Sequence, residues 1–85
     1  MFKVRIEIRL KKGISDPEGK NILKTLHLLG FGEVRDVKMA KVTELFMEGE
    51  DEKDIRNKAK AMCQRLLTNP VIHDYEITVG EEIDD

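Results

Sequence analysis

Residues 2–11 of the chain read FKVRIEIRLK, and this stretch decides the fold. Apolar and charged side chains alternate through it without a break, which is the period-two pattern of a half-buried β-strand. The apolar side chains that share one face are Phe2, Val4, Ile6, Ile8 and Leu10. The charged side chains that share the other face are Lys3, Arg5, Glu7, Arg9 and Lys11. The pattern predicts a strand with one buried face and one open face.

The sequence around Pro17 predicts the start of a helix, because proline fits the first helical turn, where its missing N–H has no partner in any case. Asp16 is placed to cap this helix, and the alternative of Ser15 as the cap of a capping box stays open. Apolar residues then recur at helical spacing up to Gly30, which suits the left-handed position that ends many helices. We expect a helix over about 17–29.

The alternating pattern of residues 33–48 predicts strand. A tight hairpin in this segment lacks its usual signal, because no Asn-Gly or Asp-Gly pair lies near Met39-Ala40-Lys41. One long bent strand therefore fits the pattern as well as two short ones. We favour two short strands.

A second helix and a last strand complete the pattern. Asp51 is placed to cap a helix over about 52–67, and Pro70 stands just past its end, where the helix does not continue. Residues 71–79 alternate again and predict the last strand. The apolar face expected for this helix consists of Ile55, Ala59, Met62, Cys63 and Leu66.

The expected order is strand, helix, strand, strand, helix, strand, in one domain over residues 1–80. This order indicates the α+β class, with an antiparallel sheet and two helices on one face, as in a ferredoxin-like two-layer sandwich. The other face stays open, and apolar residues such as Val42, Phe46 and Ile72 suit burial against a second subunit better than full exposure. The acidic residues 81–85 are expected to form a frayed, solvated tail.

Composition limits the classes of function. Fifteen basic and 17 acidic residues give a net charge of −2, which does not supply the single-sign field that nucleic acids or anionic membranes attract. No apolar stretch approaches the roughly 18 residues of a membrane span. The single cysteine, Cys63, forms no internal disulfide. We expect a cytoplasmic protein that binds neither nucleic acid nor membrane.

The sequence carries no readable catalytic, cofactor or metal motif. His27, His73 and Cys63 share no metal-ligand spacing, and the glycines form neither a phosphate-binding loop nor a dinucleotide fingerprint. His73 and Asp74 are neighbours on a strand and so point to opposite faces, which disfavours a joint catalytic role. Cys63 is interpreted as a small buried hydrophobe on the apolar helix face.

Two proline-containing segments resemble the PurS family, the small subunit of phosphoribosylformylglycinamidine synthase. They are Asp16-Pro17-Glu18-Gly19 and Asn69-Pro70-Val71-Ile72, the second followed by Asp74-Tyr75. The segments around Leu26–Phe31 and Met62–Leu67 also fit, so the resemblance covers nearly the whole chain. At Met39-Ala40-Lys41 many bacterial members instead carry a glycine before the lysine.

The resemblance implies a non-catalytic subunit that assembles with a large ATP-dependent synthetase subunit, PurL, and a glutaminase subunit, PurQ. The complex converts formylglycinamide ribonucleotide, ATP and glutamine into formylglycinamidine ribonucleotide, ADP, phosphate and glutamate. A small adaptor would hold the two active sites in register, so that ammonia passes between them without escaping to water. ATP and Mg are expected on the large subunit and no cofactor on this chain. A small-molecule-sensing ferredoxin-like regulatory domain is the alternative.

Seven residues are candidate contacts with other subunits, in a homodimer or tetramer and in the larger complex. They come from the basic first strand, the loop before the first helix and the strands expected at an interface. They are Arg5, Arg9, Asp16, Pro17, Phe46, Ile72 and Tyr75.

Overall fold

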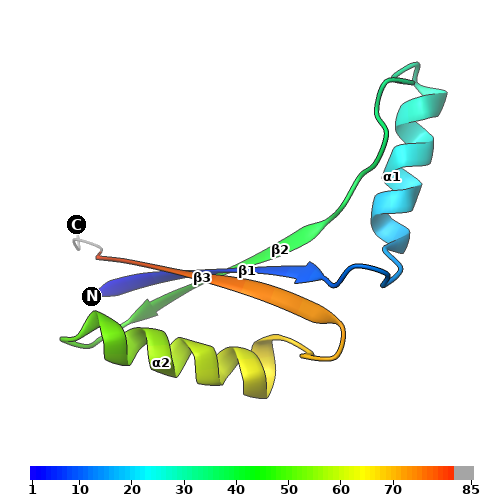
Figure 1. Ribbon diagram of the computed structural model, residues 1–85. Coiled ribbons are helices and arrows are strands. Elements are labelled where there is room, and N and C mark those ends of the chain that lie inside the picture. The colour runs from blue at the N-terminus through cyan, green and yellow to red at the C-terminus, as the bar shows by residue number, and fades with distance from the viewer. Residues whose placement is uncertain (82–85) are drawn as a thin grey trace.

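The computed structural model describes residues 1–81, which form a three-stranded antiparallel sheet and two helices (Figure 1). The order of strands in the sheet is β2-β1-β3, so the first strand lies in the centre. These findings confirm the α+β class with an antiparallel sheet and two helices. The elements are β1 (Phe2–Leu10), α1 (Pro17–Leu28), β2 (Ala40–Met47), α2 (Glu52–Met62), a π-helical turn η1 (Cys63–Leu67) and β3 (His73–Glu81).

The register of the strands separates the two faces of the sheet. Ile6 lies between Thr43 of β2 and Ile77 of β3, whereas Arg5 lies between Glu44 and Thr78. Because directly opposed residues share a face, the apolar side chains of β1 point to one side and its charged side chains to the other. The alternation read from residues 2–11 is therefore confirmed.

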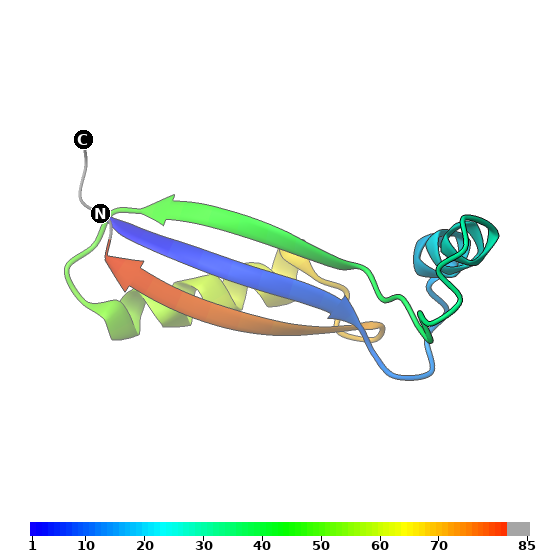
Figure 2. The same cartoon turned by 90° about the horizontal axis from the view of Figure 1, so that it is seen from above.

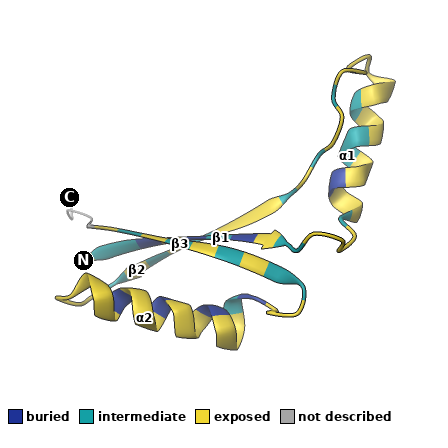
Figure 3. Cartoon of the chain, in the orientation of Figure 1, coloured by how far each residue is buried: buried dark blue, intermediate teal, exposed yellow. Residues whose placement is uncertain are grey.

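The hydrophobic core lies between the sheet and α2. Its fully buried side chains come from β1, α2 and η1, and α2 contacts chiefly β1 and β3. Figure 3 shows that the buried positions concentrate at this contact. The buried core residues are Val4, Ile6, Ile8, Ile55, Ala59 and Cys63.

The segment between the two helices forms a single strand, so the preference for two short strands is wrong. β2 begins only at Ala40, and the residues before it run back along α1 (Figure 1). Their hydrogen bonds go to the helix side, since His27 Nε2 donates to the Val34 carbonyl at 2.7 Å and Met39 N–H donates to Asp16 at 2.9 Å. Residues 34–39 therefore lie beside α1 and pair with no strand in the described part of the chain.

The first helix does not lie on the sheet, which corrects the expectation of two helices on one face. α1 projects beyond one end of the sheet and makes at most marginal contact with the strands or α2 (Figures 1 and 2). We call residues 15–39, which comprise α1 and the segment that returns to β2, the arm. The element order remains consistent with a ferredoxin-like order, with one strand fewer and with α1 displaced.

Both helices end as the sequence indicates. Gly30 adopts a φ of +99°, and the amides of Gly30 and Phe31 donate to the carbonyls of His27 and Leu26 at 3.1 and 2.9 Å, which is a Schellman motif. α2 and η1 together cover the predicted range 52–67. β3 includes Glu81, one residue beyond the expected domain end, and the rest of the predicted acidic tail lies outside the described residues.

Candidate functional site

The base of the arm is held by one carboxylate. Asp16 Oδ1 accepts a hydrogen bond from Gly19 N–H at 2.9 Å, and Oδ2 accepts one from Met39 N–H at 2.9 Å. Asp16 is therefore the N-cap of α1, and the alternative of Ser15 is excluded. These two bonds, the Met39 bond foremost, hold the pKa of the Asp16 carboxyl below its usual range, because they favour its charged form.

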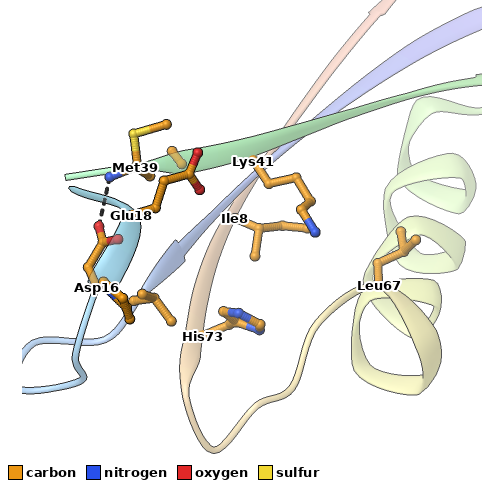
Figure 4. A pocket seen from close by; sticks show the side chains of 10 residues that line it. Ile8, Asp16, Glu18, Met39, Lys41, Leu67 and His73 are labelled. Atoms are coloured by element: carbon orange, nitrogen blue, oxygen red, sulfur yellow. Dashed lines mark hydrogen bonds between the residues drawn. The ribbon is translucent and has the colours of Figure 1, made fainter. Parts of the chain in front are cut away.

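A hollow of about 570 Å³ lies between the arm base, the end of the sheet and η1 (Figure 4). It brings together side chains from all three strands, from α1 and from η1, including Pro17 of α1, Lys41 of β2 and His73 of β3. Two candidate contacts, Asp16 and Pro17, thus line the same hollow as residues that are distant from them in the sequence.

His73 in this hollow lacks the arrangement of a catalytic base. Its Nδ1 accepts a hydrogen bond from Asn69 N–H at 2.9 Å, so the neutral ring carries its proton on Nε2. Among residues 1–81 the partner of the ring is thus a backbone amide rather than an orienting carboxylate. Asp74 forms an ion pair with Lys11 at 3.8 Å, and strand alternation places it on the other face of β3.

Metal and thiol chemistry find little support in the described part of the chain. Among residues 1–81, no three His, Cys, Asp or Glu side chains gather where they would hold a metal ion. Cys63 is fully buried in the core, and this burial raises the pKa of its thiol. The interpretation of Cys63 as a buried hydrophobe is confirmed.

The open face of the sheet carries basic side chains that are already paired. Arg9 Nε donates to Glu7 Oε2 at 2.8 Å, and Arg5 Nη2 lies 3.7 Å from Glu7 Oε1. The hydrogen bond from Arg9 is the main reason that the pKa of Glu7 is lowered. Two candidate contacts, Arg5 and Arg9, thus lie together on this face, and their charge is largely balanced there.

The other three candidate contacts lie on β2, on β3 and in the turn before β3. Phe46 is 56% exposed on the open face, opposite Lys3. Tyr75 pairs with Ile8 on the α2 side of the sheet and packs half-buried against the core. Ile72 lies in the turn before β3, where its carbonyl accepts the Lys11 N–H at 2.8 Å. The candidate residues therefore cover both faces of the sheet and the arm base rather than one patch.

An apolar groove of about 330 Å³ runs between β2 and α2. Leu66 in this groove is 82% exposed and Met62 is 36% exposed, although the helical spacing predicted both on the buried face. The π-helical turn explains the difference at Leu66, because its wider turn shifts the phase of the side chains that follow Met62. The groove is lined by Leu45, Ala61, Met62, Arg65, Leu66 and Leu67.

The end of the arm is also apolar. Leu28, Leu29 and Phe31, which we call the arm tip, are 79%, 67% and 49% exposed. The helical spacing indicated an apolar face that includes Leu29, but nothing in the periodicity shows whether the same chain covers it. Sequence reasoning therefore missed both the groove and the arm tip as surfaces.

The family model of PurS, described as phosphoribosylformylglycinamidine (FGAM) synthase, matches residues 3–81. The chain belongs to the PurS family. It is 47% identical over 79 residues to the phosphoribosylformylglycinamidine synthase subunit PurS of Methanocaldococcus jannaschii, and the match covers 93% of this chain and 95% of that protein. The predicted family is confirmed.

Solved PurS structures share the whole fold. The crystal structure of PurS from Methanocaldococcus jannaschii, described as one of the subunits of formylglycinamide ribonucleotide amidotransferase in the purine biosynthetic pathway, matches with a TM-score of 0.88 and 45% identity. That match covers 99% of this chain and 100% of the other. A chain in the structure of PurLQS from Thermotoga maritima matches with a TM-score of 0.84 and 28% identity, over 92% of this chain and 95% of the other.

Three surfaces of the described chain expose large apolar side chains: the arm tip, the groove, which includes Leu66, and the open face of the sheet, which includes Phe46. Within residues 1–81, no helix is long and apolar enough to cross a membrane.

Proposed function

We propose that this chain is the small, non-catalytic subunit of phosphoribosylformylglycinamidine synthase and serves purine biosynthesis. The observation that carries the proposal is its likeness, over 92% of its length, to a chain of the PurLQS structure. The family match over residues 3–81 and the 47% identity to a PurS subunit support the same role.

As an adaptor, the chain bridges the glutaminase subunit PurQ and the synthetase subunit PurL and supports the transfer of ammonia between them. ATP and Mg belong to PurL in this proposal, and the chain itself holds no cofactor. The placement of His73, bonded to a backbone amide, and of Cys63, buried in the core, favours a role in binding over a role in chemistry. We place the complex in the cytoplasm, in keeping with one free cysteine.

The chain works as a homo-oligomer, a dimer or a tetramer, within this complex. Its radius of gyration is 16.6 Å, whereas a compact domain of 85 residues has one of about 12 Å. Its accessible surface is 6679 Å², against about 5,200 Å² for a compact monomer of 9.8 kDa. An extended chain with this much surface is better suited to an assembly than to an isolated monomer.

Reconstitution tests the adaptor role. PurL and PurQ are assayed for glutamine-dependent formation of formylglycinamidine ribonucleotide with and without this chain, and ammonium salt as the nitrogen source provides the control. We expect omission of the chain to abolish the glutamine-dependent rate and to spare the ammonium-dependent rate. An unchanged glutamine-dependent rate without the chain would contradict the proposal.

The hollow at the arm base favours one alternative, a small-molecule-sensing domain. Its volume of about 570 Å³ falls in the range of ligand sites, and it presents Lys41 and His73 beside apolar side chains. Calorimetric titration of the intact chain with amino acids and nucleotides tests this function. Saturable heat would support sensing, and its absence would leave the adaptor role as the better account.

A further inference from the structure

We propose that a second hollow at the base of the arm binds a phosphoryl group, either as free phosphate or as the phosphate of a phosphomonoester. We call it the basic hollow, after the four basic side chains that line it, Arg9, Lys11, Lys12 and Lys38. Its volume is about 280 Å³, and it shares Leu10, Asp16 and Met39 with the larger hollow beside η1. The proposal goes beyond the adaptor role and does not depend on it.

The fold concentrates positive charge at this hollow, although the whole chain has a net charge of −2. Arg9 and Lys11 come from the end of β1 and the position that follows it. Lys12 belongs to the loop that leads to α1, and Lys38 belongs to the segment that returns along α1; the two segments meet at the arm base (Figure 2). Within residues 1–81, Asp16 is the single acidic residue that lines the hollow. Such a concentration of one sign of charge attracts an anion.

Most of this positive charge is available to a ligand. Lys12 and Lys38 are exposed and form no ion pair among residues 1–81. The ion pair of Lys11 is long, at 3.8 Å, and lies between exposed side chains, so it is weak. Arg9 donates through Nε to a neighbouring carboxylate, and within the described chain its Nη groups bond to no other residue.

Asp16 positions the basic hollow rather than neutralising it. Its Oδ1 accepts a hydrogen bond from Gly19 N–H and its Oδ2 accepts one from Met39 N–H, both at 2.9 Å. These bonds hold the start of α1 against the returning segment, so the loop and the segment that carry the cations are already in place without a ligand. A preformed site loses less conformational freedom when a ligand binds.

The charge and the size of the hollow favour a phosphoryl group over a carboxylate. A phosphomonoester carries a charge of about −1.5 to −2 at neutral pH and three oxygens that accept strong hydrogen bonds, whereas a carboxylate carries one charge and two oxygens. Cations from separate segments can bond to different phosphate oxygens, and the forked guanidinium of Arg9 suits phosphate geometry. The volume is slightly below the usual range of drug-sized ligand sites, which suits a small anionic group.

A ligand in the basic hollow would connect the arm to the end of β1. Lys12 lies before α1 and Lys38 lies after it, so an anion held between them bridges the two chain segments at the arm base. Any ligand that binds the folded arm base stabilises it by mass action. The basic hollow therefore suits an effector that changes the stability of the arm, without a chemical step.

NMR titration of the intact chain tests the binding. Inorganic phosphate and adenosine 5′-monophosphate are the two phosphoryl probes, and acetate and adenosine are the controls for a carboxylate and for a nucleoside without phosphate. Ionic strength is kept constant, because salt screens exposed charges. We expect saturable shifts at the amides of residues 11–14 and 38–39 with a phosphoryl probe and none with the controls. The probe that binds more tightly tells whether free phosphate or a phosphomonoester is preferred.

A double substitution tests the cations that lack partners. We expect Lys12→Gln combined with Lys38→Gln to weaken phosphoryl binding by about tenfold or more, because charge-assisted hydrogen bonds are the stronger ones. Lys60→Gln is the matched control, since Lys60 is an exposed lysine of α2 without an ion pair among residues 1–81. It should leave binding unchanged. All three positions are exposed, and circular dichroism checks that the variants stay folded.

The outcomes separate this inference from the function proposed above. The absence of saturable shifts with both phosphoryl probes would overturn it and leave the four cations as a solvated surface. Acetate that binds as tightly as phosphate would also overturn it and would indicate a surface for acidic protein side chains. Binding that is unchanged in the double variant would exclude the basic hollow as the site. None of these results decides the adaptor role, which depends on the rate of glutamine-dependent synthesis.

Discussion

The two helices are nearly equal in length, 11 residues in α2 and 12 in α1, yet they contribute very differently to the core. α2 buries Ile55 and Ala59 completely, whereas Gly19 is the only buried residue of α1. Both helices have an apolar face. The difference shows that an apolar helix face predicts burial but does not identify the surface against which the helix packs.

The two regions are held by different kinds of interaction. The region of α2 depends on burial of apolar side chains against the sheet, which dominates folding stability. The arm depends on local hydrogen bonds at its base, and the apolar side chains at its tip are exposed. Substitutions in the two regions should therefore affect different measurements.

The largest expected effect is that of Ile55→Ala, because Ile55 is fully buried between α2 and the sheet. Removal of a fully buried isoleucine side chain lowers the free energy of unfolding by about 2–5 kcal/mol, which is a large share of the stability of a small domain. The half-buried Ile22→Ala in α1 is the control and should cost less. Equal losses in chemical denaturation would break the distinction between core and arm.

A smaller effect is expected for Gly19→Ala at the base of the arm. An added Cβ would collide with the Val37 carbonyl and approach Asp16 Oδ2 to 2.8 Å. Overpacking of this kind costs about 1–3 kcal/mol, more than the gain in helix propensity from glycine to alanine. We expect faster hydrogen exchange at Met39, whose amide bonds to Asp16.

Gly32→Ala is the matched control for that substitution, since an added Cβ there would meet no atom within 4 Å and Gly32 has no positive φ. In the Gly32→Ala variant, the hydrogen-exchange rate of the Met39 amide should equal that of the wild type. If both variants exchange alike, the close packing at Gly19 does not hold the arm.

The pH dependence of the arm base follows from Asp16. Its pKa is lowered in the folded chain, so its contribution to stability is present above the unfolded value of about 3.9 and is lost as pH falls through the lower folded value. NMR should show the Met39 amide shift unchanged to below the usual Asp range and then changing. Asp16→Asn should abolish this low-pH change. A transition at or above the ordinary value would contradict the capping role.

The smallest effect is expected on the open face of the sheet. Arg9→Ala removes an ion pair and hydrogen bond between the exposed Arg9 and the partly buried Glu7, and ion pairs at a protein surface contribute little because solvent screens them. The midpoint of thermal unfolding should not change measurably, as for Lys58→Ala, which removes an exposed pair with Asp54 on α2. A clear loss for Arg9→Ala alone would indicate that this face is more than a solvated surface.

Local patterns in the sequence correctly predicted one strand and both ends of the first helix. The alternation of β1, the cap at Asp16 and the glycine end of α1 at Gly30 follow from strand period, capping chemistry and positive φ, and the structure has all three. The family, too, follows from short motifs around Pro17 and Pro70.

The parts that the sequence did not predict depend on tertiary choices. Whether residues 33–39 pair as a strand or bond along α1 is decided by partners that periodicity does not contain. Leu66 is exposed because one wide π-helical turn changes the helical phase, and nothing in the spacing signals that turn. The groove and the arm tip were missed for a similar reason, since helical spacing shows an apolar face but not whether the same chain buries it.

Hydrogen exchange of the wild-type chain as a function of its concentration tests the central claim most directly. If the proposed homo-oligomer covers the arm, protection of the α1 amides should rise as the chain passes from monomer to dimer. In the buried part of α2 around Ile55, the protection against exchange through local opening should stay constant. Protection of α1 that does not change across a monomer–dimer transition would contradict the account.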